Sequence, residues 1–175
     1  MIIKRVEVRN FRNIKRASID FSDRFNFITG DNAQGKTNLL EAIHMFSLGR
    51  SFRTRRSEEM IDFGEEFFFV RLHGRSDQGP AFTMELGLER GGRMRAGVNG
   101  NRLPGVSGII GMIPSVIFTP EDVGISSGPP AGRRLFVDYT AAQISPAFLA
   151  DLKEFRKALT QRNSLVRKIQ AGEAG

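Results

Sequence analysis

The run from Gly30 to Thr37 has the residue types and the spacing of a phosphate-binding loop. It matches the pattern G-x-x-x-x-G-K-[ST], in which two glycines let the backbone curl until successive N–H groups converge on the phosphates of a nucleotide. A strand-like segment precedes the run and a helix-like segment follows it, which is the context that this chemistry needs. We therefore predict that a nucleotide is bound by Gly30, Asp31, Asn32, Ala33, Gln34, Gly35, Lys36, Thr37 and Asn38.

The end of this loop carries the expected charge contacts. The helix that begins near Lys36 adds the positive end of its dipole, and the Lys36 ammonium neutralises the β- and γ-phosphates. The Thr37 hydroxyl is the expected Mg²⁺ ligand. The chain has no Asn-Lys-x-Asp element for guanine recognition, which argues against a GTPase but does not by itself identify the nucleotide. The alternative is a glycine turn that only caps a helix.

Four arginines lie just beyond the helix that follows the loop. Arg50, Arg53, Arg55 and Arg56 fall within seven residues, and no acidic residue interrupts them in the sequence. Cations at this density suit contacts with the phosphates of DNA or of a nucleotide. The alternative is an ordinary solvated surface, and the sequence leaves both interpretations open.

The composition excludes several classes of protein. Without cysteine there are no disulfides, thiolate zinc sites or cysteine nucleophiles, and two histidines are too few for a histidine-rich metal site. The formal charge of +7 at pH 7 favours nucleic acid or another polyanion as a partner. No apolar run approaches the roughly 18 residues of a membrane span, and the first residues are charged. We therefore expect a cytoplasmic protein without a membrane segment or a secretory signal.

Elements of two kinds must position these side chains. Apolar residues at helical spacing predict a helix over residues 37–48, directly after the loop, with Gly49 as its stop. Gly91-Gly92 and Asn99-Gly100 are hairpin signals. Apolar patterning predicts strands at residues 3–8, 17–21, 25–28, 67–72, 81–88 and 115–118, of which the short run at 25–28 is expected to be buried.

The remaining segments are shorter or differ in kind. We expect a turn at residues 76–80, a short helix at 106–113 and a loop at 119–132. Ser145-Pro146 is an N-cap followed by a proline at the first helical position. A helix is therefore predicted over residues 146–170, with apolar residues spaced as in a heptad seam.

Motifs along the whole chain resemble those of one family. The extended run Gly-Asp-Asn-Ala-Gln-Gly-Lys-Thr-Asn-Leu-Leu-Glu-Ala-Ile is similar to the phosphate loop of the SMC-like ATPases, where Asn is common at the position of Asn32. Four further runs occur in the order found in the RecF family of ABC-type ATPases. They are residues 8–13, 48–54, 118–122 and 133–138.

The resemblance to the RecF family implies a fold and a function. It implies an α/β (α+β) ATPase head, with residues 1–140 as lobe I and residues 141–175 as the beginning of a helical lobe II. Lobe I would hold the phosphate loop, an antiparallel sheet and a mixed central sheet. The implied function is ATP-dependent DNA binding in recombinational repair and replication-gap processing, with ATP binding driving homodimerisation on DNA. The implied partners are single-strand/double-strand DNA junctions, RecR and RecO, and Arg12 is placed near the base or ribose.

The chain also departs from the family pattern. RecF proteins are longer, and their remaining part carries the signature motif and the Walker B acidic pair, so we expect this chain to be an N-terminal fragment. Glu121, Asp122 and Asp138 are poor substitutes for that pair, and we assign no catalytic residue. The chain is expected to bind ATP without turning it over. A small-molecule or nucleoside kinase and a nucleotide-independent interaction module remain alternatives.

Overall fold

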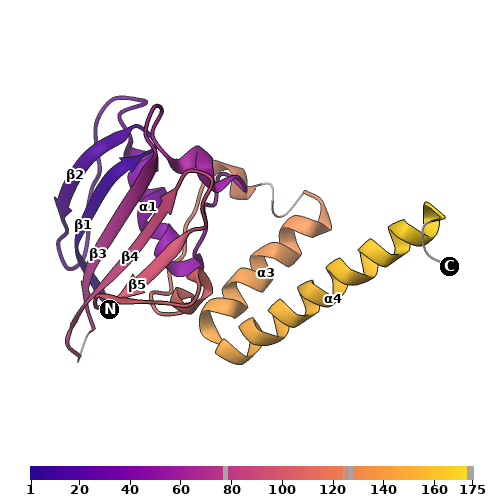
Figure 1. Ribbon diagram of the computed structural model, residues 1–175. Coiled ribbons are helices and arrows are strands. Elements are labelled where there is room, and N and C mark those ends of the chain that lie inside the picture. Colours follow the sequence, from indigo (N-terminus) through magenta and orange to yellow (C-terminus); the bar gives the residue numbers. More distant parts are fainter. Residues whose placement is uncertain (77–78, 124, 126–127, 173–175) are drawn as a thin grey trace. The chain divides into compact units, whose positions relative to one another are not determined.

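A single six-stranded antiparallel sheet dominates the first part of the molecule (Figure 1). The computed structural model describes residues 1–76, 79–123, 125 and 128–172. Neighbouring strands follow the order β2-β1-β3-β4-β5-β6, so β1 and β3 pair although a helix lies between them in the sequence. The strands are β1 (Ile2–Phe11), β2 (Ile14–Asp20), β3 (Phe67–Arg75), β4 (Ala81–Glu89), β5 (Arg95–Val98) and β6 (Asn101–Arg102).

The helix α1 (Lys36–Leu48) covers one face of this sheet, and the core lies between the two. Side chains alternate along β3 between buried and partly exposed, so that Phe68, Val70 and Leu72 all face inward. The Phe68 ring meets the Phe11 ring edge to face, with 5.2 Å between centroids. The sheet and α1 therefore share one apolar interior, and this packing fixes the helix that follows the phosphate loop.

The β1–β2 hairpin is tied at its open end by two ion pairs. Arg5 donates to the Asp20 carboxylate at 2.6 and 3.2 Å, and Lys4 pairs with Asp23. These hydrogen bonds hold the pKa of both carboxyls below the usual value, although burial acts in the opposite direction. The other end of the hairpin is the turn that carries Arg12.

Most predicted elements are confirmed, and so is the α+β class. The helix over residues 37–48 forms as α1, and Gly49 ends it in the left-handed region at φ 66°, donating its N–H to the Met45 carbonyl. Asn99 and Gly100 both have positive φ in the β5–β6 turn, as an Asn-Gly hairpin requires. Of the predicted turn at 76–80, residues 77 and 78 lie outside the described residues.

The predicted strands at residues 25–28 and 115–118 are wrong, since neither segment is paired as a strand. Both remain unpaired chain with exposed apolar side chains, and Phe27 and Val116 are 90% and 92% exposed. An apolar run forms a strand only where a neighbour satisfies its N–H and C=O groups. The described strands supply no such neighbour and form only the antiparallel sheet, so the expected mixed central sheet is not formed by them.

Two further segments differ from the prediction because they contain short 3₁₀ turns. The predicted helix at 106–113 is only the 3₁₀ turn η2 (Val106–Ile109). The predicted loop at 119–132 contains the 3₁₀ turn η3 (Pro120–Val123) and the start of the next long helix. A third 3₁₀ turn, η1 (Ser57–Met60), lies after α1. Turns this short carry too few side chains to show a period in the sequence.

The chain divides into two compact units, residues 1–117 and 118–175. In the second unit α3 (Pro130–Ile144) and α4 (Pro146–Gln170) form a helical hairpin, in which Arg156 pairs with Asp138 at 3.1 Å. The predicted cap is confirmed, because the Ser145 hydroxyl accepts a hydrogen bond from the Phe148 N–H. The lobe boundary at residue 140 stays a prediction. None of the helices within the described residues combines the length and the apolar character that a membrane crossing requires.

The packing of Phe68 yields a stability prediction. We expect Phe68→Ala to lower the free energy of unfolding by about 3–5 kcal/mol, because the substitution removes a ring from the closed interior and leaves a cavity. Urea unfolding followed by circular dichroism measures the change. The matched control is Phe63→Ala, whose ring is fully exposed and whose removal should change stability by less than about 0.5 kcal/mol. Equal effects of the two substitutions would contradict this description of the core.

Candidate nucleotide-binding site

The loop between residue 29 and α1 adopts a backbone that only selected residues tolerate. Gly30, Ala33 and Gly35 have φ values of 142°, 64° and 94°. Positive φ at three of six successive positions bends the chain into a tight curl, and glycine adopts it without steric cost. The two glycines of the predicted motif therefore sit where the curl requires them.

Gly35 is also needed because of what lies beside it. A Cβ atom at this position would stand 2.9 Å from the Asn13 Oδ1 atom and 3.3 Å from the Ile14 side chain. Asn13 in turn donates from its Nδ2 atom to the Ala33 carbonyl at 2.7 Å. The turn of the β1–β2 hairpin therefore rests directly on the phosphate loop and fixes its position.

The Lys36 ammonium lies within the curl. Its Nζ atom donates to the carbonyls of Gly30 and Asp31 at 2.6 and 2.5 Å. An ammonium has three donors, so one remains for a phosphate oxygen. The loop thus holds a positive charge close to its own backbone, and the contact of Lys36 with the β- and γ-phosphates stays a prediction.

The N-terminus of α1 is open to an anion. Gly35 is the N-cap and has no side chain that could accept the N–H groups of the first turn, and that turn contains no acidic residue. The Thr37 side chain is exposed at this end, as a metal-ligand role requires. The loop residues between the two glycines are exposed as well: Asp31, Asn32, Ala33 and Gln34.

Arg12 lies beside the loop but is bound to a buried carboxylate. Its Nε and Nη2 atoms donate to the two Glu41 oxygens at 3.1 and 2.7 Å, and its Nη1 atom donates to the Glu59 carbonyl at 2.8 Å. The Arg12 backbone has φ 56°, a strained value for a residue with a side chain. The bidentate pair with Glu41, which is fully buried, holds this arginine in one orientation.

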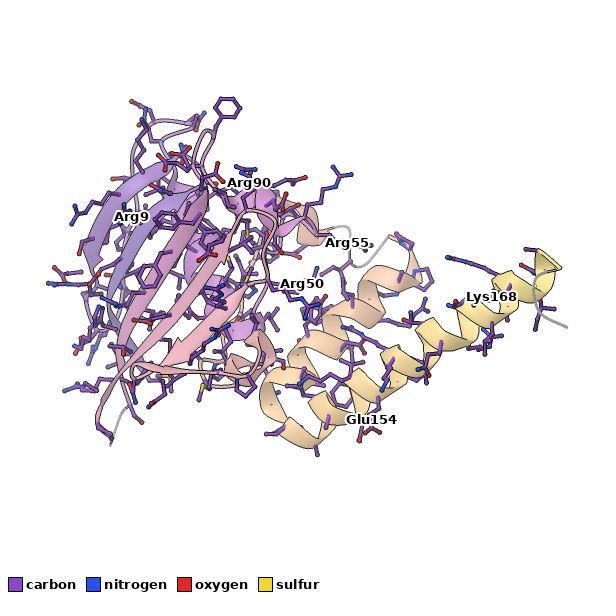
Figure 2. The ribbon with its side chains drawn as sticks, in the orientation of Figure 1. Arg9, Arg50, Arg55, Arg90, Glu154 and Lys168 are labelled. Atoms are coloured by element: carbon purple, nitrogen blue, oxygen red, sulfur yellow. The ribbon has the colours of Figure 1, made fainter. Side chains whose placement is uncertain are left out.

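The four predicted DNA-contacting arginines differ in their surroundings. The Arg53 side chain is exposed to solvent but is held in place, since it donates to Asn38 Oδ1 at 2.6 Å and to Glu41 at 3.3 Å. Arg55 and Arg56 are exposed, and Arg50 is partly buried. Figure 2 shows Arg50 and Arg55 on the segment after α1. The arginine segment, residues 50–56, thus contains arginines that are held by other side chains and arginines that face solvent. The sequence alone does not show which arginine belongs to which group.

A cavity of about 980 Å³ lies next to these arginines. Arg12, Asn13, Asn38 and Arg53 form its wall beside the phosphate loop. Its remaining charged lining is mixed and consists of Arg56, Arg90, Glu58, Glu59 and Asp62. A volume of this size, open beside an anion-binding loop, suits the sugar and base of a nucleotide.

Sequence reasoning missed Glu41 and Asn13. Glu41 was hidden because a carboxylate on a helix is usually solvated, yet here it lies on the buried face of α1 among Leu39, Ala42 and Met45. One sequence feature could have indicated its burial: Glu41 is the one charged residue in an otherwise apolar run, residues 39–43. Asn13 carried no signal, because its importance depends on contacts with a loop twenty residues away.

Two of the three carboxylates considered as catalytic candidates are engaged within the second unit, and the side chain of the third, Glu121, lies outside the described residues. Asp122 accepts hydrogen bonds from the Thr119 N–H and hydroxyl at 2.6 and 2.8 Å, and Asp138 pairs with Arg156. Among the residues that the structure describes, no group of three or more His, Asp or Glu side chains gathers in a way that could hold a metal ion.

Comparisons with known proteins agree with this geometry. A family model described as an AAA ATPase domain matches residues 1–77. The DNA replication and repair protein RecF of Caldanaerobacter subterraneus subsp. tengcongensis is 41% identical over 170 residues, which are 97% of this chain and 47% of that protein. RecF of Bacillus cereus is 37% identical over 172 residues, which are 97% of this chain and 45% of that protein.

Solved structures show the same relationship. A structure of the recombination mediator protein RecF with ATP has a TM-score of 0.88 and 41% identity, covering 96% of this chain and 46% of that one. An SMC ATPase structure has a TM-score of 0.63 at 23% identity over 79% of this chain, which shows a shared fold. The chain spans about half the length of the curated relatives that it matches. On this identity along nearly its whole length and on this shared fold, the chain belongs to the RecF family.

Proposed function

We propose that this chain binds ATP with Mg²⁺ as part of an ATP-gated DNA-binding protein of recombinational repair and replication-gap processing. The observation that carries the proposal is the curl from Gly30 to Thr37, which holds the Lys36 ammonium against its own carbonyls and ends at the uncapped N-terminus of α1. Membership of a family with a solved ATP complex supports the choice of nucleotide.

The proposed division of labour follows from the residues that are present. The loop N–H groups and Lys36 would hold the phosphates, and Thr37 would hold Mg²⁺ through its exposed hydroxyl. The cavity beside Arg12 and Asn38 would take the ribose and base. Bound Mg²⁺ supplies charge neutralisation at the phosphates, and the chain supplies orientation.

The wider activity is proposed on the family relationship. The partners would be DNA at single-strand/double-strand junctions, RecR and RecO, with the longer protein dimerising when ATP binds. A related solved protein is a recombination mediator of the RecFOR pathway, which supports this assignment. A kinase is not favoured, because residues 67–102 form an antiparallel sheet rather than a helical lid over the loop.

Replacing the loop lysine tests nucleotide binding. We expect Lys36→Ala to weaken ATP and ADP binding roughly 10- to 100-fold, the effect of removing one charge-assisted hydrogen bond, without loss of fold. Isothermal titration calorimetry with Mg²⁺ measures the affinities, and circular dichroism checks the fold. Lys168→Ala on α4, an exposed lysine of the other unit, is the matched control. Wild-type affinity in Lys36→Ala would refute the site.

The arginine segment makes a separate prediction about DNA. Changing Arg50, Arg53, Arg55 and Arg56 together to Gln should weaken DNA binding without regard to sequence. The slope of log affinity against log salt should fall by about 0.9 for each phosphate of duplex DNA that the variant no longer neutralises. Fluorescence anisotropy over a salt series gives this slope. A control with the same charge change uses arginines from β3 to β5: Arg71, Arg75, Arg93 and Arg95.

An unchanged salt slope in the first variant would show that the segment does not bind DNA phosphates. An equal fall in both variants would show that net charge alone attracts DNA, so the segment would have no special role.

Turnover is expected to stay at background in this 175-residue chain. Hydrolysis needs a carboxylate to orient the attacking water and a second side to the magnesium site, whereas the described residues form no cluster of three or more His, Asp or Glu side chains that could complete it. A steady-state phosphate-release assay at saturating ATP tests this, with Lys36→Ala as the control for contaminating ATPase. Turnover that disappears in Lys36→Ala would instead make Glu121, Asp122 or Asp138 a catalytic candidate.

A further inference from the structure

Glu41 is the charged side chain that the proposed chemistry leaves unexplained. It is fully buried on α1, and both of its oxygens are occupied. Oε1 accepts from Arg12 Nη2 at 2.7 Å and from the Ser51 hydroxyl at 2.5 Å. Oε2 accepts from Arg12 Nε at 3.1 Å and from Arg53 Nη1 at 3.3 Å. One carboxylate thus joins the β1–β2 turn, α1 and the arginine segment.

Stability alone does not require this arrangement. A buried ion pair is often no more stabilising than an apolar group of the same size, because both charges lose their hydration. What the carboxylate provides is orientation, since a bidentate arginine can lie in only one plane. The Ser51 hydroxyl adds to this by accepting from the N–H groups of Arg53 and Thr54 at 2.9 and 3.0 Å, which fixes the backbone that carries Arg53.

A continuous line of contacts runs from this carboxylate to the phosphate loop. Arg53 donates to Asn38 Oδ1, and Asn38 donates from Nδ2 to Asn13 Oδ1 at 2.7 Å. Asn13 then donates to the carbonyl of Ala33, inside the loop. Arg53 is therefore held by the same first turns of α1 that close the loop, and it lines the adjoining cavity.

We propose that Glu41 is a positioning residue that couples the nucleotide site to the arginine segment. It holds Arg12 and Arg53 against α1. Nucleotide binding at the phosphate loop would therefore alter the position of Arg53, and a polyanion bound to the arginine segment would alter the affinity of the loop for nucleotide. The inference rests on the proposed function and adds a route between its two sites. Because coupling between binding sites is reciprocal, each ligand must alter the affinity of the other by the same factor.

Linked binding measurements on the 175-residue chain test the route. The probes are Mg²⁺ with a slowly hydrolysed ATP analogue and a short DNA duplex with a single-stranded tail. In the wild type we expect each probe to raise the affinity of the other by about 5-fold or more. Glu41→Gln keeps the size of the side chain but removes its charge, and we expect the factor to fall to about one while both probes still bind.

A second variant guards against misfolding of the first. Arg53→Lys keeps the charge on the segment, but a single ammonium on a flexible stem does not reproduce the planar fork that reaches Asn38 and Glu41 together. We expect the coupling factor to fall to about one, and circular dichroism checks that the variant is folded. Glu7→Gln is the matched control, because it removes a carboxylate that pairs with Arg71 and His73 on the sheet instead.

The outcomes separate this inference from the proposed function. A wild-type chain that binds no ATP analogue would overturn both. Binding of both probes with a coupling factor near one in the wild type would overturn the inference alone, and so would a wild-type factor in folded Arg53→Lys. Loss of coupling in both Glu41→Gln and Arg53→Lys, with the factor retained in Glu7→Gln, supports Glu41 as the positioning residue. A wild-type factor in folded Glu41→Gln would overturn the inference, since a merely structural role would lower thermal stability without a selective loss of coupling.

Discussion

The absence of a side chain at Gly35 is the constraint on which the site depends. Two segments meet there, the turn of the β1–β2 hairpin and the end of the phosphate loop, so closely that a Cβ atom would displace the Asn13 side chain. Because β1 is a central strand of the sheet, this contact transfers the rigidity of the sheet to the loop. A loop that must present backbone N–H groups to phosphates gains from such support, since groups already in place need no reordering when a ligand binds.

The second requirement is the compensation of a buried charge. An isolated carboxylate in the interior costs several kcal/mol, and removal of one partner from a buried pair typically costs about 3–5 kcal/mol. Glu41 avoids this cost through four hydrogen bonds that come from two parts of the chain, the β1–β2 turn and the segment after α1. Its presence explains why Arg12 tolerates a strained backbone and why Arg53 differs from its neighbours. The arginine segment, uniform in the sequence, therefore has two kinds of member.

Features of this structure could be predicted from the sequence when the residues that form them are close together in the chain, and not when they are far apart. The phosphate loop and α1 were predictable because their residues are contiguous and their geometry is local, as at Gly30 and Gly49. Glu41 and Asn13 were not, because their partners lie in other segments that only the folded sheet brings close. The segments at 25–28 and 115–118 failed for a related reason: apolar alternation shows that a strand is possible, but pairing decides whether it forms. The order of the family motifs carried the functional assignment, which local patterns alone left open.

The pairing of β1 with β3 has a consequence for how the molecule reaches its native state. The phosphate loop, α1 and the arginine segment all lie in the stretch of chain that this pairing closes into a loop. Closing it costs entropy before the contacts of the sheet can compensate, and topologies of this kind fold slowly. The β1–β2 hairpin and α1 are local and can form early, whereas the complete sheet that supports them needs the long-range step. During synthesis on the ribosome, therefore, we expect the sheet that supports the proposed nucleotide site to be completed only after β3 has emerged.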